Sequence, residues 1–395
     1  MTARRVEGSA DAVSRLRTSV VASFVLTTVW ACSTSEGDGA APSCAATEII
    51  AAASDYQSSV VCGAPPCALG PFTTGTDLGT DPSLAVSNGR VFYVGRDNDT
   101  IFELDATCGT PLRNGRYSTR QNDLKVSNPH DVAAASNGSI FVVLYNVPRI
   151  VVLGKDGKPD GAPIDLASRD DDGNPQAEAI HIIEVGGVEK AFVTLQRLDD
   201  TRPGLLSNKP SQMLRIDVAT RQIEAVIELA GRNPFNTMAE LNGALFLAEP
   251  GNFDADDEPL AGIERFETAT STSRLLVAEK DLGGSVAEVA VTEGCGAAII
   301  AGKQKPDNPT SLVTFDPATG KVLAAASAPL LATPGYDLQA LAWKGNTLYV
   351  GDRRKGGVGF RLHAFERDPG TCILHATGRD ITLPQRPVAI RAASR

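Results

Sequence analysis

The chain has 395 residues, 42% of them hydrophobic and 21% charged, and a formal net charge of −10. This composition provides enough apolar surface for a core and is ordinary for a globular protein. Acidic residues outnumber basic ones, 47 to 37, and the basic residues form no cluster like the one that a nucleic-acid-binding face requires. The composition therefore argues against a nucleic-acid partner.

The segment 1–31 has the pattern of a signal peptide. Arginines at positions 4, 5, 15 and 17 precede an uncharged, mostly apolar run over 19–31. A basic start, a short apolar run and small residues at its end are typical of secretory signals. Because the run is shorter than the roughly 20 residues that a membrane-spanning helix needs, the sequence predicts export rather than membrane insertion.

The end of this segment resembles the cleavage site of bacterial lipoprotein signals. Val29, Ala31 and Cys32 match that pattern, whereas Trp30 is bulkier than the residue usually found there. The resemblance implies cleavage before Cys32, acylation of its thiol and a lipid anchor, and Ser33 after it favours the outer membrane. Residues 32–45 are then a flexible tether. A plain signal peptide with an incidental cysteine is the alternative.

Export would place the remaining cysteines in an oxidising compartment, where disulfides form. Cys62 and Cys67 lie close enough in sequence to close a hairpin, and Cys108 and Cys372 occupy matching places in two repeats. Six cysteines allow 15 connectivities, so the pairing stays open. The six are Cys44, Cys62, Cys67, Cys108, Cys295 and Cys372. They form no Cys/His cluster with the spacing of a zinc site.

A block built around a glycine recurs six times along the chain. Successive anchoring glycines are 49 to 56 residues apart, and each follows one short apolar run and precedes a second. A nearly constant period of roughly 40–50 residues, made of short strands, is the signature of β-propeller blades. The anchors are Gly89, Gly138, Gly187, Gly243, Gly294 and Gly345.

The sequence predicts an all-β fold, a seven-bladed β-propeller with four antiparallel strands in each blade, over residues 46–395. Within 129–166, four apolar runs are separated by turn residues. The segment 383–393 reads as a further inner strand, and 47–63 reads as a second and a third strand. Pairing these two ends in a seventh blade would remove free sheet edges. A six-bladed ring with unpaired terminal strands is the alternative.

Three of the predicted third strands end in Asp and a turn of the Thr-Gly type, at 100–109, 213–222 and 311–320. These endings resemble those of YncE-like propellers with YVTN repeats, in which an Asp-x-x-Thr-Gly hairpin joins the outer strands. The resemblance implies a fold and no particular activity.

Signatures of catalysis are missing from the sequence. There is no GxSxG, HExxH, Walker or CxxCH motif. The four histidines are spread over positions 130, 181, 363 and 375, which disfavours a histidine-rich metal site. These absences favour a protein that binds a partner over one that catalyses a reaction.

The best candidates for a site lie on the inner strands, whose starts surround one mouth of a propeller's channel. Aligning the repeats places several oxygen-bearing side chains at equivalent positions, and converging oxygens suit a cation such as Ca²⁺, which takes roughly 6–8 oxygen ligands. The gluconolactonase type of lactonase uses a similar set, although no local motif of that family is matched. The candidates are Asp131, Glu178, Asn236, Glu288 and Gln339. A polar, hydrated channel without a ligand is the alternative.

A second, weaker candidate is the acidic loop over 169–174. Asp170 and Asp172 alternate with other residues before Gly173, as oxygen donors do in calcium loops. The closing Glu and the helix pair of an EF-hand are absent, so a solvated acidic turn is the alternative.

Long loops are predicted to follow the second strands of three blades, at 196–212, 249–263 and 302–310. Loops at equivalent positions lie on one face, and such loops commonly carry specificity. The leading hypothesis is therefore a non-enzymatic, lipid-anchored envelope protein that binds a protein, peptide or glycan through this face. The alternative is a Ca²⁺-dependent lactonase or hydrolase at the channel mouth.

Overall fold

The computed structural model of the protein describes residues 47–64, 73–75, 78–120, 126–201, 206–253, 258–303, 308–357 and 359–392. The predicted signal peptide, the tether, Cys32, Cys44 and Cys67 lie outside these ranges. In the described ranges, no helix is long and apolar enough to cross a membrane.

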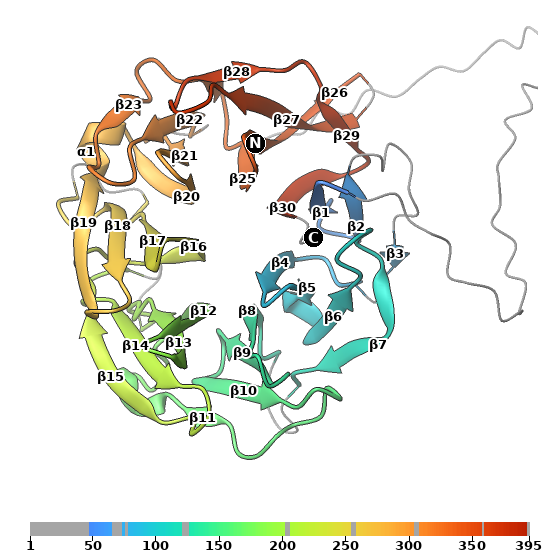
Figure 1. Cartoon of the computed structure of the whole chain (residues 1–395), viewed down its shortest axis with the longest axis vertical. Coiled ribbons are helices and arrows are strands. Elements are labelled where there is room, and N and C mark those ends of the chain that lie inside the picture. The colour runs from blue at the N-terminus through green and yellow to red at the C-terminus, as the bar shows by residue number, and fades with distance from the viewer. Residues whose placement is uncertain are drawn as a thin grey trace, which may run out of the picture. The chain divides into compact units, whose positions relative to one another are not determined.

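The described residues form seven antiparallel sheets that stand around a central axis, so the fold is a seven-bladed β-propeller (Figure 1). The blades are numbered here from the first one after the N-terminal strands: blade 1 is β4–β7, blade 2 β8–β11, blade 3 β12–β15, blade 4 β16–β19, blade 5 β20–β24, blade 6 β25–β29, and blade 7 combines β30 with β1–β3. The predicted number of blades and of strands per blade is confirmed, with one added strand in each of blades 5 and 6.

Each blade has an inner strand at the axis and three further strands toward the outside (Figure 1). The inner strands are β4 (Pro82–Ser87), β8 (Pro129–Ala134), β12 (Ala177–Val185), β16 (Phe235–Leu241), β20 (Ser285–Thr292), β25 (Leu338–Lys344) and β30 (Arg386–Ala392). The second strands are β5 (Arg90–Gly95), β9 (Ile140–Leu144), β13 (Val188–Leu195), β17 (Ala244–Glu249), β21 (Cys295–Ala301), β26 (Thr347–Gly356) and β1 (Ile49–Ser54).

The outer half of each blade consists of a third strand and a fourth one, which is divided into two short strands in blades 5 and 6. The third strands are β6 (Thr100–Leu104), β10 (Arg149–Leu153), β14 (Gln212–Asp217), β18 (Gly262–Glu267), β22 (Thr310–Phe315), β27 (Gly359–Arg367) and β2 (Ser59–Ala64). The outermost are β7 (Pro111–Ser118), β11 (Ile164–Asp165), β15 (Ile223–Glu228), β19 (Thr272–Ala278), β23 (Val322–Ala324) with β24 (Leu331–Thr333), β28 (Leu374–Ala376) with β29 (Ile381–Leu383), and β3 (Thr73–Gly75). A four-residue helix, α1 (Glu279–Leu282), follows β19.

The repeating glycines lie in the turns between inner and second strands, as the period predicted. All six have positive φ, and in blades 1 and 4 the preceding Asn88 and Asn242 do too, with φ of 49° and 52°. Two successive positive φ values define a type I′ turn, whose twist matches that of a β-hairpin. The glycines recur because each of these turns needs a residue with positive φ at this position.

The ring closes within blade 7, where β30 from the end of the chain pairs with β1 from its beginning. Ile390 lies opposite Ala51 and Arg391 opposite Ile50 in this antiparallel pair. The predicted closure, with 383–393 as the inner strand and 47–63 as the next two, is confirmed. It leaves neither terminal strand with a free edge beside the channel.

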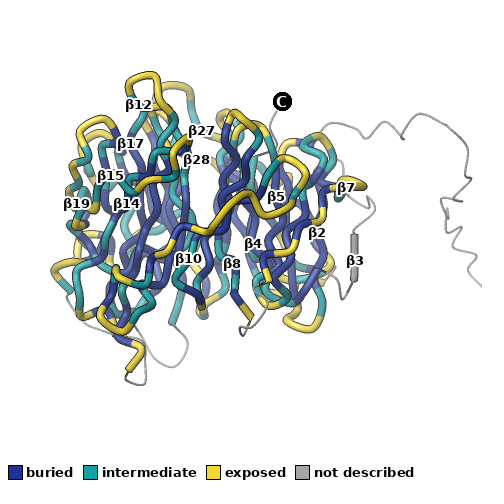
Figure 2. Tube along the Cα trace, turned by 90° about the horizontal axis from the view of Figure 1, so that it is seen from below, coloured by how far each residue is buried: buried dark blue, intermediate teal, exposed yellow. Residues whose placement is uncertain are grey.

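The core is divided among the interfaces between neighbouring blades. Each of seven clusters of buried apolar residues in the described part of the chain combines side chains from two adjacent blades. Second strands such as β1 and β9 are buried along their whole length because they contact a blade on both faces. Exposed residues gather at the turns at the two ends of the strands (Figure 2).

A disulfide between Cys295 and Cys372 joins blade 5 to blade 6. Cys295 begins β21 and Cys372 lies just before β28, so the bond crosses the face of the ring that carries the glycine turns. Cys108 is also disulfide-bonded. The suggested Cys62–Cys67 hairpin involves a residue outside the described ranges.

Candidate functional site

The polar residues predicted on the inner strands connect each blade to the next. Asp131 on β8 accepts a hydrogen bond from the backbone N–H of Ile180 on β12, at 3.0 Å. Glu178 on β12 accepts one from the N–H of Asn236 on β16, also at 3.0 Å. Each carboxylate therefore binds the inner strand of the following blade.

The same pattern continues in the next two blades. The side-chain amide of Asn236 donates to the carbonyl of Ala287 on β20, at 2.9 Å. Both oxygens of Glu288 accept backbone N–H bonds from β25, from Ala340 at 2.8 Å and from Leu341 at 3.1 Å. Four of the five predicted residues thus form a belt of hydrogen bonds around the channel, whereas Gln339 accepts one from Arg353 in its own blade, at 2.9 Å.

This belt explains why these residues occupy equivalent positions, and it uses the oxygens that a cation would need. Among the described residues, no group of three or more His, Cys, Asp and Glu side chains is arranged to hold a metal ion. Burial raises the pKa of Asp131 to about 6, although the N–H groups of Ile180 and Val132 lower it. Burial likewise raises the pKa of Glu288, against the field of Arg391.

The acidic loop is held by cations of the protein itself. Oδ1 of the buried Asp170 lies 2.6 Å from Nζ of Lys209 and 3.5 Å from a guanidinium nitrogen of Arg197. Asp172 accepts a hydrogen bond from the N–H of Asn174 within the turn, at 2.9 Å. Asp170 therefore anchors the loop that carries Lys209, and Asp172 shapes a turn.

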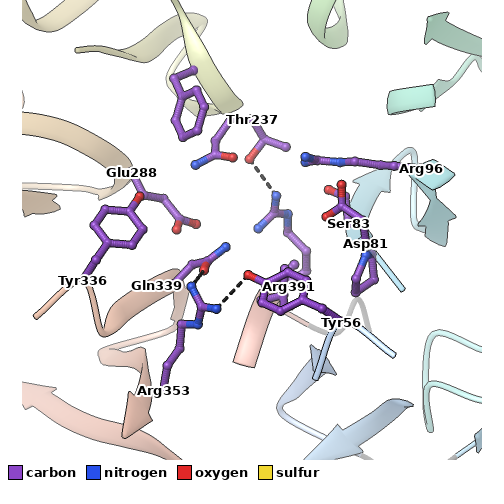
Figure 3. Close-up of a pocket in the computed structure, with 15 residues that line it drawn as sticks. Tyr56, Asp81, Ser83, Arg96, Thr237, Glu288, Tyr336, Gln339, Arg353 and Arg391 are labelled. Carbon is purple, nitrogen blue, oxygen red and sulfur yellow. Dashed lines mark hydrogen bonds between the residues drawn. The ribbon is translucent and has the colours of Figure 1, made fainter. Parts of the chain in front are cut away.

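The cavity that combines most polar groups lies at the mouth where the inner strands begin, and it encloses about 200 Å³. The guanidinium group of Arg391, on β30, donates to Oγ1 of Thr237 on β16 at 2.6 Å, from the opposite side of the ring (Figure 3). These two residues also line the two cavities farther down the channel. Their hydrogen bond therefore separates the mouth from the lower channel.

Two more arginines extend into this mouth, Arg353 from β26 and Arg96 from the turn after β5 (Figure 3). Arg353 donates to Oε1 of Gln339 at 2.9 Å and to the hydroxyl of Tyr56 at 2.7 Å. It also lies over the ring of Tyr56, 5.5 Å from the centroid. Together with Arg391, three guanidinium groups from blades 1, 6 and 7 thus face one small space.

The long loops lie on the face that carries this mouth, as the sequence predicted. Ser207 in the loop between β13 and β14 donates its N–H to Asn252, in the loop between β17 and β18, at 2.8 Å. Phe253 of the second loop contacts Phe235 at the rim of the mouth, with ring centroids 5.2 Å apart. The loops and the mouth therefore form one continuous surface.

A buried histidine lies beside the belt. Nδ1 of His130 is 2.7 Å from Oε2 of Glu178, and the imidazole stacks on Tyr145 with centroids 4.1 Å apart. Burial lowers the pKa of His130, although Glu178 raises it. Burial raises the pKa of Glu178, but His130 and Arg96 lower it, and the net shift of this pKa is downward. Both shifts favour a neutral imidazole beside a charged carboxylate, and in that state Nδ1 is the donor.

The comparisons with known proteins support the fold and assign no function. No family model matches the chain, and no curated protein matches it. The chain is similar to the structure of the RRP9 WD40 repeats, with a TM-score of 0.57, 11% identity and 89% of each chain covered. It is similar to the structure of U3-55K, with a TM-score of 0.53, 11% identity, and 79% of this chain and 84% of that one covered. A streptogramin B lyase follows at a TM-score of 0.48 and 12% identity, over 79% of this chain and 86% of that one. The class of protein that fold and comparisons define is the seven-bladed β-propeller.

The three arginines of the mouth were not among the residues predicted from the sequence. Arg96 follows the second strand β5, Arg353 lies within the second strand β26, and Arg391 lies near the end of an inner strand. Arg96 and Arg353 occupy matching positions in blades 1 and 6, because each donates its backbone N–H to the carbonyl of the aspartate before the inner strand, Asp81 and Asp337, but aligning the repeats does not bring Arg391 to them. Only the ring closure places Arg391 opposite blade 4.

Proposed function

We propose that this propeller is a binding protein that holds a protein, peptide or glycan of the cell envelope on the face formed by the mouth and the long loops. The observation that supports this most is that four large apolar side chains are exposed on this face, two at the mouth and two in the loops. Tyr56 and Tyr336 at the mouth are 50% and 40% exposed, and Leu206 and Leu260 in the loops are 37% and 36% exposed. Large apolar side chains gathered on one face are typical of interaction surfaces.

The test is site-specific photo-crosslinking in the native envelope. A photoreactive phenylalanine analogue replaces Leu206 or Leu260, and Val188 provides the matched control. Val188 is 44% exposed in a glycine turn, at the opposite end of the strand that leads to the first loop. The same adduct is expected from positions 206 and 260 and not from 188. Adducts from 188 alone, or from none of the three positions, would contradict the proposal.

The lipid anchor at Cys32 is part of the same proposal, because it would present this face in the envelope. It is supported by the likeness of the sequence before Cys32 to lipoprotein signals. Labelling cells with a palmitate analogue should mark the wild-type protein and not the Cys32→Ser variant. Equal labelling of both would argue for a plain signal peptide.

A hydrolase or lactonase at the channel mouth is the second candidate function, and the His130–Glu178 pair favours it. A neutral imidazole oriented by a carboxylate can act as a general base through its other nitrogen. The full-length protein would then hydrolyse a lactone or ester, and His130→Gln would abolish turnover without lowering the melting temperature. Turnover that is unchanged in His130→Gln would exclude this pair as its source.

A further inference from the structure

We infer that the mouth of the channel binds an anionic group, a carboxylate or a phosphate, carried by the ligand. This inference rests on the proposed function and adds the chemistry of the ligand at one part of the surface. Three guanidinium groups line the space, against two carboxylates, those of Asp81 and Glu288. The whole protein has a net charge of −10. The excess of positive charge in the mouth is therefore opposite in sign to the net charge of the protein.

The carboxylate of Glu288 binds the backbone of the next blade instead of these arginines. Its two oxygens accept the N–H groups of Ala340 and Leu341 in the next blade. None of the hydrogen bonds made by Arg353 and Arg391 goes to a carboxylate: their acceptors are the side chains of Gln339, Tyr56 and Thr237 and the carbonyl of Ile390. The guanidinium groups thus retain the capacity to bind an external anion.

The inner ends of two of these guanidinium groups have no acceptor in the protein. Nε of Arg96 and Nε of Arg353 are both shielded from solvent and have no hydrogen-bond partner in the part of the chain that the structure describes. An oxygen anion in the cavity would instead bind the terminal nitrogens of the guanidinium groups, whose planar fork matches the two oxygens of a carboxylate or phosphate.

The shape of the space fits a small charged group rather than a folded partner. The cavity encloses about 200 Å³, and the bond between Arg391 and Thr237 spans the channel at its inner side (Figure 3). Tyr56 and Tyr336 stand at its rim, and Phe235 lines its wall. The anion would therefore reach the arginines while the group that carries it contacts the aromatic rings.

The test is calorimetric titration of the purified full-length chain with three probes. They are the dipeptide acetyl-Ala-Ala with a free carboxylate, the same dipeptide as its amide, and inorganic phosphate. Binding of the acid and not of the amide would identify a carboxylate, and binding of phosphate alone would identify a phosphate ligand. Arg96→Gln, which removes the charge and leaves a shorter, polar side chain, should weaken the binding about tenfold or more, because bonds to charged groups contribute about 1.5–3 kcal/mol.

Arg379→Gln is the matched control, because Arg379 has an exposed ion pair with Glu366, far from the inner strands. Arg353→Gln is the second variant, and circular dichroism confirms that each variant is folded. Binding of none of the probes, or binding that Arg96→Gln and Arg353→Gln leave unchanged, would overturn the inference. Crosslinks from positions 206 and 260 without anion binding would overturn this inference alone and leave the proposed function standing.

Discussion

Arg391 and Thr237 are 154 residues apart in sequence, and a hydrogen bond of 2.6 Å joins their side chains across the channel. Arg391 belongs to the strand that closes the ring, and Thr237 to the inner strand of blade 4. The contact therefore links the closing blade to the far side of the propeller. Both residues line the cavity at the mouth and the cavities farther down the channel.

Replacing Thr237 with Val tests this contact. The variant keeps the shape of the side chain and removes the acceptor of a charged donor, a change that costs about 1.5–3 kcal/mol. Urea unfolding is expected to show a lower free energy of unfolding by about this amount. Thr270→Val, at an exposed turn position, is the control. Equal decreases in the free energy of unfolding of the two variants would show that the bond to Arg391 adds no stability.

The Cys295–Cys372 bond is expected to be a major source of stability. It closes a loop over a sequence separation of 77 residues, and a bond of this kind typically contributes 2–4 kcal/mol by restricting the unfolded chain. The double variant Cys295→Ser/Cys372→Ser should unfold at a lower urea concentration, with a loss of about that size. An unchanged midpoint would mean that the contacts between blades 5 and 6 suffice on their own.

Asp131 is expected to make stability depend on pH in a defined window. Its pKa rises from 3.8 to about 6 on folding, so the folded protein holds the proton more tightly than the unfolded chain. The stabilisation is complete below pH 3.8 and is lost as the pH rises to about 6. A shift of about two pKa units corresponds to about 3 kcal/mol.

The measurement compares wild type with Asp131→Asn at a series of pH values. The difference in unfolding free energy should shift in favour of the variant between pH 4 and pH 7, because asparagine carries no charge to bury. Parallel curves for the two proteins would show that Asp131 does not titrate in this window.

The belt of hydrogen bonds leads to a prediction for Ca²⁺. Because the oxygens of Asp131 and Glu288 already accept N–H groups of neighbouring blades, the melting temperature should be the same in EDTA and in excess Ca²⁺. A ligand that binds only the folded state would stabilise it by about 2.7 kcal/mol at a hundredfold excess over its Kd. An upward shift that Asp131→Asn plus Glu288→Gln abolishes would instead support the metal-dependent hydrolase.

The sequence was most informative where the backbone repeats. The turns at Gly89 and Gly243 need positive φ, so glycine marks each hairpin and the period gives the number of repeats. The closing blade was predictable because 383–393 shares the pattern of an inner strand. Both signals are local, and both report conformations that every blade must adopt.

The chemistry of the channel was less predictable, because it depends on the orientation of side chains, which the sequence does not specify. The equivalent positions of Asp131 and Asn236 were recognised, but whether they face a ligand or the next blade depends on the irregular register at the starts of the inner strands. The pairing of Cys295 with Cys372 had many competitors among six cysteines. Arg96 and Arg391 line the same cavity only because the ring is closed.

The closure of blade 7 by β30 also sets the order in which this protein is assembled. β30 follows the other six blades in the sequence, so β1 lacks this partner until those blades have been made. Until then the growing chain exposes the edge of β1, which is a template for pairing with another chain. Once β30 has docked, unfolding of the ring has to begin with its release or with the separation of two packed blades. Folding is therefore most vulnerable just before completion, and the finished ring is expected to open slowly.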